Sequence, residues 1–353
     1  MNRCERLILA IGDKADGMLI SSEVNQLYLT GFEFSDGYVL VTKNKSYLIT
    51  DFRYTEAAKL NADKSFEIVT LEKGLFEKLF DENNVNTLLF EDTRMTCSML
   101  EQLKNKHCNI NFIPAGNIIE DLREYKSDIE IEYITKAQRI AEKSLKMLID
   151  NFDKNMTEKE LAAYLEYLMK KNGADGISFA TIAVSGKASS LPHGVPRNRK
   201  LENGFLTIDF GAVYKGYHSD MTRTFCIGKA DSDMKKVYNT VLEAQTKAID
   251  AIFSGERNCF SIDKVAREHI YTNGFDGCFG HGLGHGVGLE IHEAPRLSPL
   301  ADKNKMLEFG DIVTVEPGIY IENKYGVRIE DMIYIGKNTP VNLTVFEKNL
   351  IEL

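Results

Sequence analysis

The sequence has no concentration of positive charge. Its 43 lysine and arginine residues are spread along the chain and are outnumbered by 52 aspartate and glutamate residues, for a net charge of −9. A protein that follows a phosphate backbone needs clustered lysine and arginine, so we expect no nucleic-acid partner. The chain also lacks an apolar run of membrane-spanning length, and we expect no membrane partner.

Cysteines are few and isolated. The six cysteines stand at positions 4, 97, 108, 226, 259 and 278. None has the short paired spacing of a zinc-thiolate site or a redox motif, so we expect reduced thiols. The apolar run at 7–11 is too short for the core of a signal peptide and is followed by Asp13 and Lys14. Both features predict a cytoplasmic protein.

The chain does contain enough apolar sequence for two domains. It has 353 residues, of which 43% are hydrophobic and 27% charged, and it has no low-complexity stretch or repeat. A single core rarely serves so many residues. We predict a smaller α/β domain over residues 1–121 and a larger α+β domain over residues 122–353.

The pattern of apolar residues changes near this boundary. In the first part short strand signals alternate with helical ones, with strands at 17–20, 38–41 and 47–50 and helices at 54–61 and 75–82. From Asp128 apolar residues recur at helical spacing for about six turns, and Thr157 begins a capping-box pattern. Strand signals then dominate, at 177–184, 204–210, 221–228, 312–321 and 325–335. We predict antiparallel pairing in this part, with helices at about 234–254 and 261–273.

Glycine and histidine are concentrated between positions 280 and 292. This segment holds three of the seven histidines, His281, His285 and His292, and five of the 26 glycines. Glycine contributes no side chain to a core, so such a run indicates backbone that lies close to another group. Histidine in this setting favours a metal site or a catalytic pocket. The plainer alternative is a glycine-rich loop with incidental histidines.

Two aspartates flank a predicted hairpin. Asp209 lies near the end of one strand signal and Asp220 begins the next. With a turn centred between Tyr214 and Lys215, the two carboxylates would be directly opposed on one face of the sheet. Carboxylates at that distance repel unless a cation or a shared proton lies between them, which favours a metal. The alternative is a pair of solvent-exposed aspartates at strand ends.

Two glutamates lie within strand signals. Glu316 and Glu330 are flanked by β-branched apolar residues, where an unpaired charge is costly. Both positions are therefore site candidates. Arg328 lies two residues before Glu330 and would face the same side of the strand. An ordinary arginine–glutamate pair is the alternative for that strand.

These residues together form an oxygen-rich candidate ligand set. Asp209, Asp220, His285, Glu316 and Glu330 supply four carboxylates and one imidazole, enough charge for two divalent ions. Such ligands favour manganese, iron, cobalt or zinc over copper. Two ions about 3.5–4 Å apart can convert a bridging water to hydroxide and polarise a scissile carbonyl. Hydrolysis of an amide is the reaction that we expect.

The motifs around these residues resemble those of the pita-bread metallopeptidases, specifically aminopeptidase P and prolidase. Segments 209–224, 280–295, 315–320 and 326–331 match the family's signatures in order and spacing. Segments 25–32 and 50–54 are similar, more weakly, to its creatinase-like N-terminal domain. The resemblance implies a pita-bread catalytic domain and a homodimer. It also implies two divalent metal ions, manganese first, with cobalt, zinc or iron as alternatives.

The same resemblance assigns roles to individual residues. It implies five metal ligands, which are Asp209, Asp220, His285, Glu316 and Glu330, with Asp220 and Glu330 bridging both ions. It implies that His193, His281 and His292 bind substrate and stabilise the tetrahedral intermediate and leaving group. Glu316 would also shuttle a proton, and Arg328 and Tyr320 would support the ligands. Tyr28 and Arg53 remain open between an active-site role and a structural one.

The activity implied by the resemblance is hydrolysis of the bond between an N-terminal residue and a following proline in a peptide substrate. This is the reaction of an Xaa-Pro aminopeptidase, and a prolidase restricted to dipeptides is the alternative. Creatinase and inactive peptide-binding relatives have lost metal ligands, whereas this chain retains all five. Methionine aminopeptidase generally lacks the N-terminal domain predicted here.

Overall fold

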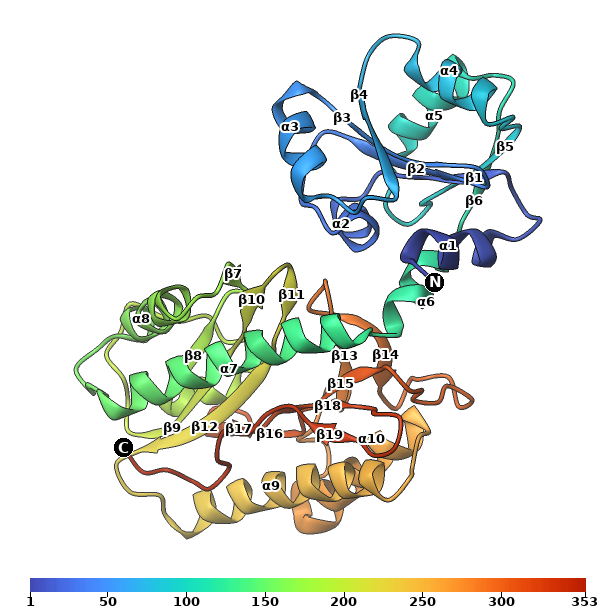
Figure 1. Cartoon of the computed structure of the whole chain (residues 1–353). Helices are drawn as coiled ribbons and strands as arrows, with labels where there is room; N and C mark the ends of the chain where they lie inside the picture. Colours follow the sequence, from blue (N-terminus) through green and yellow to red (C-terminus); the bar gives the residue numbers. More distant parts are fainter. The chain divides into compact units, whose positions relative to one another are not determined.

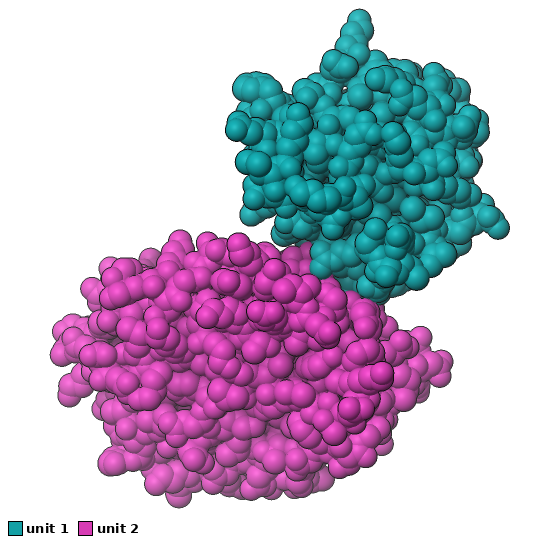
Figure 2. All heavy atoms as spheres, in the orientation of Figure 1, with its two compact units in different colours: residues 1–123 teal, residues 124–353 magenta.

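The chain folds as two units, which Figure 2 colours separately. The computed structural model describes residues 1–353, and the units are Met1–Arg123 and Glu124–Leu353. None of the helices combines the length and the apolar composition that crossing a bilayer requires.

The first unit is built around one mixed sheet. Its strands are β1 (Gly17–Ile20), β2 (Tyr38–Thr42), β3 (Ser46–Thr50), β4 (Phe66–Thr70), β5 (Thr87–Phe90) and β6 (Asn111–Pro114). They lie in the order β4-β3-β2-β1-β5-β6, with parallel pairs at β3–β4, β1–β5 and β5–β6. The helices are α1 (Arg3–Ile11), α2 (Glu23–Thr30), α3 (Phe52–Asn61), α4 (Leu75–Glu82), α5 (Cys97–Lys106) and α6 (Ile118–Glu124). The α/β character predicted for this part of the chain is confirmed.

Two residues that the sequence left open have partners within this unit. The hydroxyl of the buried Tyr28 donates to the carbonyl of Leu122 at 3.2 Å. The guanidinium of Arg53 forms ion pairs with Asp36 and Asp51. These contacts give both residues a structural role inside the first unit.

The second unit begins with two long helices that pack on strands. The elements are α7 (Asp128–Asp150), α8 (Glu158–Lys171), β7 (Gly176–Ile177), β8 (Ile182–Ser185), η1 (Gly186–Ser190), β9 (Gly204–Phe210), β10 (Ala212–Tyr214), β11 (Tyr217–His218) and β12 (Met221–Ile227). Capping boxes at Ser127 and Thr157 start α7 and α8 where the sequence predicts them. Apolar faces of both helices share one core with β8, β9 and β12.

The rest of the second unit repeats this plan on the opposite side of the strands (Figure 1). Its elements are α9 (Ser232–Phe253), α10 (Cys259–Ile270), η2 (Tyr271–Phe275), β13 (Gly284–Gly286), β14 (Glu293–Leu297), β15 (Ile312–Val315), β16 (Gly318–Ile321), β17 (Tyr325–Arg328), β18 (Asp331–Tyr334) and β19 (Val341–Asn342). Helices α9 and α10 share a core with β14 to β18. All named strand pairs of this unit are antiparallel, which confirms the predicted α+β class.

The hairpin that carries the two aspartates differs in register from the prediction. Its turn is centred between Lys215 and Gly216, which adopt positive φ values of 52° and 80°. Thr222, and not Asp220, therefore lies opposite Asp209. The prediction was wrong because lysine rarely occupies a left-handed turn position, so the turn was centred one residue too early. The two-residue offset still leaves Asp220 on the face of Asp209.

Glu316 and Glu330 lie at a break between strand pairs, not inside strands as expected. Strands β15 and β18 pair on one side of the break, and β16 and β17 pair on the other. At the break the backbone N–H of Glu316 donates to the Leu283 carbonyl at 2.8 Å, and that of Glu330 donates to the Thr222 carbonyl at 3.1 Å. The expected strands 312–321 and 325–335 are divided because their backbone changes partners at the glutamates.

Candidate metal centre

A cavity of about 580 Å³ lies among the strands of the second unit. Its wall contains the five nominated metal ligands, the three nominated substrate-side histidines and Arg328. These residues are Asp209, Asp220, Glu316, Glu330, His193, His281, His285, His292 and Arg328. The fold thus gathers side chains from widely separated segments into one place.

Three buried side chains form the tightest group in this cavity. Asp220, His285 and Glu330 each offer one ligand atom, and these three atoms lie within 4.8 Å of one another. Asp220 directly precedes β12, His285 is the middle residue of β13, and Glu330 directly precedes β18. Carboxylate and imidazole groups at this spacing can hold a divalent metal ion.

The ring of His285 is oriented by its own backbone. Its Nδ1 lies 3.0 Å from the carbonyl oxygen of Gly286, which can only accept, so Nδ1 carries the proton. The other nitrogen, Nε2, lies 3.6 Å from Asp220 Oδ2 and 3.4 Å from Glu316 Oε1. Burial lowers the pKa of His285 to about 4, so the ring is neutral at pH 7. A neutral ring with one nitrogen fixed by a carbonyl is typical of a metal-ligating histidine.

Burial also shifts the carboxyl groups of the centre. It raises the pKa of Glu316 to about 8, and the charge of Asp209 adds to the effect. The pKa values of Asp220 and Glu330 lie well above their usual range because both groups are buried beside other carboxylates. A divalent cation would reverse these shifts, because it stabilises the ionised carboxylates.

Two carboxylate oxygens in the centre have no hydrogen-bond partner. They are Oδ1 of Asp209 and Oδ1 of Asp220, and both are buried. A buried carboxylate oxygen without a partner is costly. Four carboxylates and one neutral imidazole with two unpartnered oxygens fit a divalent metal, and they fit hard ions best.

Arg328 connects Asp209 to the far side of the cavity. Its guanidinium donates to Asp209 Oδ2 at 2.6 Å and to the hydroxyl oxygen of Tyr320 at 2.8 Å. That hydroxyl lies 3.0 Å from His281 Nε2. The arginine therefore pairs with Asp209, and not with Glu330 as the sequence allowed. The chain of bonds fixes the orientation of both Asp209 and His281.

Three further histidines face the cavity at different depths. His281 is half-buried, with Nδ1 4.0 Å from Glu316 Oε2. The ring of His292 lies edge-on to that of His285, with centroids 4.5 Å apart. His193 and His292 are exposed at the cavity wall. All three are in position to meet a molecule that enters.

The structure adds two polar residues that the sequence did not single out. Thr222 donates its hydroxyl to Glu330 Oε2 at 2.7 Å. Arg296 lies in the cavity wall, on β14 directly opposite His285. The two-residue period of a strand would have found Thr222, because it follows Asp220 by two positions. Arg296 has no such local signal.

The lining of the cavity includes apolar residues. Phe179 comes from the segment between β7 and β8, Ile182 begins β8, and Ile291 and Val195 come from loops. The expected single strand at 177–184 is wrong, since β7 and β8 belong to different sheets. The interruption turns this segment into a wall of the cavity.

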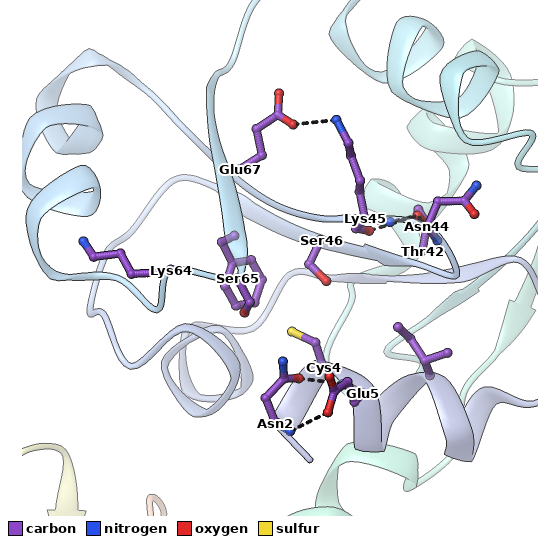
Figure 3. Close-up of a pocket in the computed structure, with 12 residues that line it drawn as sticks. Asn2, Cys4, Glu5, Thr42, Asn44, Lys45, Ser46, Lys64, Ser65 and Glu67 are labelled. Atoms are coloured by element: carbon purple, nitrogen blue, oxygen red, sulfur yellow. Dashed lines mark hydrogen bonds and ion pairs between the residues drawn. The ribbon is translucent and has the colours of Figure 1, made fainter.

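A second cavity, of about 400 Å³, lies in the first unit (Figure 3). Its charged groups already have partners, since Lys45 pairs with Glu67 at 3.0 Å and Lys64 donates to the Lys59 carbonyl at 2.9 Å. Burial raises the pKa of the Cys4 thiol to about 11, so this thiol is a poor nucleophile. The chemistry of the chain therefore centres on the second unit.

Buried carboxylates and a neutral imidazole that open onto a partly apolar cavity define a metal-dependent hydrolase. The chain belongs to metallopeptidase family M24, whose model matches residues 132–337. Residues 3–125 match the model of the creatinase/prolidase N-terminal domain. The predicted family is confirmed, and with it a peptide substrate and a requirement for divalent metal.

Relatives of the chain agree in both sequence and fold. It is 38% identical over 353 residues to the Xaa-Pro dipeptidase of Pyrococcus furiosus, covering 99% of each chain. It is similar to the structure of an Xaa-Pro dipeptidase from Bacillus anthracis, with 38% identity, 99% coverage of each chain and a TM-score of 0.93. It is also similar to the structure of an X-Pro aminopeptidase from Thermotoga maritima, with 36% identity, 100% coverage of each chain and a TM-score of 0.92. The predicted two-domain pita-bread fold is confirmed.

Proposed function

We propose that this protein hydrolyses the bond between an N-terminal residue and a following proline, with two divalent metal ions, as an Xaa-Pro aminopeptidase. The convergence of nine nominated side chains on one cavity carries the proposal. The names of relatives that match the whole chain support its specificity for proline. Apolar lining residues such as Phe179 and Ile291 suit a proline ring.

The side chains of Asp209, Asp220, His285, Glu316 and Glu330 would hold the two divalent ions. The unpartnered oxygens of Asp209 and Asp220 support this assignment. When bound, the ions supply Lewis-acid chemistry, which polarises the scissile carbonyl and lowers the pKa of the attacking water. We propose manganese as the native metal, because the ligands are mostly carboxylates.

The residues around the metal centre handle protons and substrate. Glu316 lines the cavity, with its Oε2 4.0 Å from Nδ1 of His281, so it can exchange a proton with a group bound there. His281 is held by Tyr320 and faces the cavity, so it can stabilise charge that develops on the substrate. His193 and His292 line the exposed part of the wall, where they can bind the peptide.

One observation favours the alternative, a dipeptidase. Arg296 lines the cavity on the strand beside His285. In an Xaa-Pro dipeptide the proline next to the scissile bond carries the free carboxylate, and an arginine in the cavity can bind this group. A longer peptide has a neutral amide at that point. The name of the Pyrococcus furiosus relative supports the same alternative.

Three properties of the molecule complete the proposal. We propose that it is a homodimer and that it acts in the cytoplasm. We also propose a domain division into residues 1–121 and 122–353, which the two compact units support.

A panel of substrates tests this function. Purified protein reconstituted with manganese is offered Gly-Pro, a longer Xaa-Pro peptide, a Met-Ala peptide and creatine. We expect turnover of both proline substrates and of neither control. Turnover of Gly-Pro alone would identify a prolidase, and no turnover with any of manganese, cobalt, zinc or iron would refute the proposal.

A further inference from the structure

Lys126 is a buried cation that no part of the proposed reaction uses. Its side chain is 1% exposed, and its ammonium forms an ion pair with Glu293 at 3.1 Å, whose side chain is 7% exposed. Removing both charges from water is costly, so replacing a buried pair by apolar side chains often stabilises a core. Such a pair can instead fix one particular arrangement of the chain.

Lys126 is itself held firmly. Its backbone N–H donates to the carbonyl of Gly310 at 3.0 Å. The next residue, Ser127, forms the capping box with Glu130 that starts α7. The start of α7 lies beside β14, whose first residue is Glu293 (Figure 1). Lys126 thus lies just before the long helix, and its ammonium group reaches Glu293 at the start of β14.

Glu293 organises the segment that carries His292. One of its carboxylate oxygens accepts from the backbone N–H of Glu290 at 3.0 Å, and the other accepts from Lys126. The carboxylate packs against the backbone of Gly288, where any Cβ would collide with it. The carbonyl of Gly288 in turn accepts from the backbone N–H of His218 at 2.9 Å. We call residues 287–292 the His292 loop.

We propose that Lys126 is a positioning residue of the active site, which holds the His292 loop through Glu293 so that His292 stays beside His285. This inference rests on the proposed function, because His292 is there a substrate-side group. The contacts form a continuous path from α7 to the ring of His292, 4.5 Å from that of His285. Lys126 touches no reacting group and acts only through this path.

A double-mutant cycle tests the proposal in the manganese-loaded protein. We expect Lys126→Met to lower kcat on Gly-Pro at least tenfold while two metal ions stay bound. In a His292→Ala background the same substitution should change kcat less than twofold, because the group that Lys126 positions is gone. An equal loss in both backgrounds, an unchanged kcat in Lys126→Met, or loss of metal would overturn the proposal.

The variants include a control and a safeguard against misfolding. Lys305→Met breaks another lysine–glutamate pair of this unit, with Glu124, and should leave kcat within twofold. The double variant Lys126→Met/Glu293→Gln removes both buried charges, so the carboxylate of Glu293 is not left buried without a partner. We expect it to fold and to show the same loss of kcat as Lys126→Met. Normal kcat in this double variant would contradict the proposal.

Hydrogen exchange gives a readout that does not depend on activity. We expect amides in the peptide 287–293 to exchange at least tenfold faster in Lys126→Met than in the wild-type protein, and at the wild-type rate in Lys305→Met. If the wild-type protein turns over no peptide, the proposed function fails. The exchange rates alone then decide the positioning role, and equal rates in Lys126→Met and wild type would refute it.

Discussion

At the scale of single residues, the metal centre depends on groups that hold carboxylates in place without neutralising all of them. Arg328 is the cation in contact with this cluster, and it is 4% exposed. It satisfies one oxygen of Asp209 and leaves the other, Oδ1, without a partner. Thr222 donates its neutral hydroxyl to one oxygen of Glu330. Oxygens therefore remain available to a metal.

Replacing Arg328 by lysine should separate its charge from its geometry. A lysine keeps the positive charge but cannot bond Asp209 and Tyr320 together as the planar guanidinium does. We expect kcat on Gly-Pro to fall about 10- to 100-fold, as for other groups that orient metal ligands. Steady-state kinetics of Arg328→Lys measure this, with Arg257→Lys, outside the cavity, as the matched control. An unchanged kcat in Arg328→Lys would show that the two hydrogen bonds of the planar guanidinium are unimportant.

Arg296 should decide between dipeptides and longer peptides. If it binds the free carboxylate of a dipeptide, Arg296→Met should raise KM for Gly-Pro about tenfold or more, since a charge-assisted bond contributes roughly 1.5–3 kcal/mol. KM for a longer Xaa-Pro peptide should change less than twofold. Equal effects on the two substrates would remove this argument for a dipeptidase.

The types of residue in the site were predictable from sequence, whereas their partners were not. Acidic residues among β-branched neighbours and histidines among glycines stood out because both are costly without a function. The ion pair of Arg328 with Asp209 joins residues 119 positions apart. No local pattern encodes such a contact, because it arises only when two hairpins pack together.

At the scale of elements, two hairpins set the geometry of the centre. The first turns at Lys215 and Gly216, and its register could not be read correctly because the pair lacks the usual asparagine–glycine signal. In the second, Glu316 and Glu330 stand level with each other where the strand pairing breaks. The unbroken strand expected at 312–321 overlooked Pro317 and Gly318, a pair that marks the end of a strand. Around Glu330 apolar residues continue on both sides, so there only the change of backbone partners reveals the break.

The glycine at position 284 allows β13 to approach β15 closely. A Cβ there would fall far inside contact distance of the Thr314 carbonyl, whereas a Cβ on Gly280 would meet nothing within 4 Å. We expect Gly284→Ala to destabilise the protein by about 1–3 kcal/mol, as overpacking does, and to weaken metal binding through His285. Urea unfolding and metal titration measure both effects, with Gly280→Ala as the control. Equal stability of the two variants would contradict this view of the glycine run.

At the scale of the whole molecule, stability should depend on pH in opposite ways with and without metal. Burial raises the pKa of Glu316 from 4.5 to about 8, so the metal-free folded state binds more protons than the unfolded state between these values. Below pH 6.5 the histidines oppose this effect, because burial lowers the pKa of His281 and of His285 from 6.5 to about 4, so their contribution to stability rises with pH there. Stability should therefore fall as the pH rises from about 6.5 to 8, by up to about 1.4 kcal/mol per pH unit for each such carboxyl group. Bound metal keeps the carboxylates ionised and should abolish or reverse this fall.

Thermal unfolding of chelator-treated and manganese-loaded protein between pH 6.5 and 8 measures this difference. We expect Tm of the chelated protein to decrease with pH in this range and the gap between the two forms to widen. A chelated protein that gains stability from pH 6.5 to 8 would show that the carboxyl groups are not protonated in the metal-free fold.

The most direct test of the central claim is a titration of metal-free protein with manganese, in which bound ions and Gly-Pro hydrolysis are measured in the same samples. The account predicts that activity rises with binding and that two ions are bound per chain at saturation. Asp220→Asn, which removes a proposed ligand, should bind fewer ions and lose more than 100-fold in kcat. Full metal content and activity in that variant, or hydrolysis by the metal-free wild-type protein, would contradict the account.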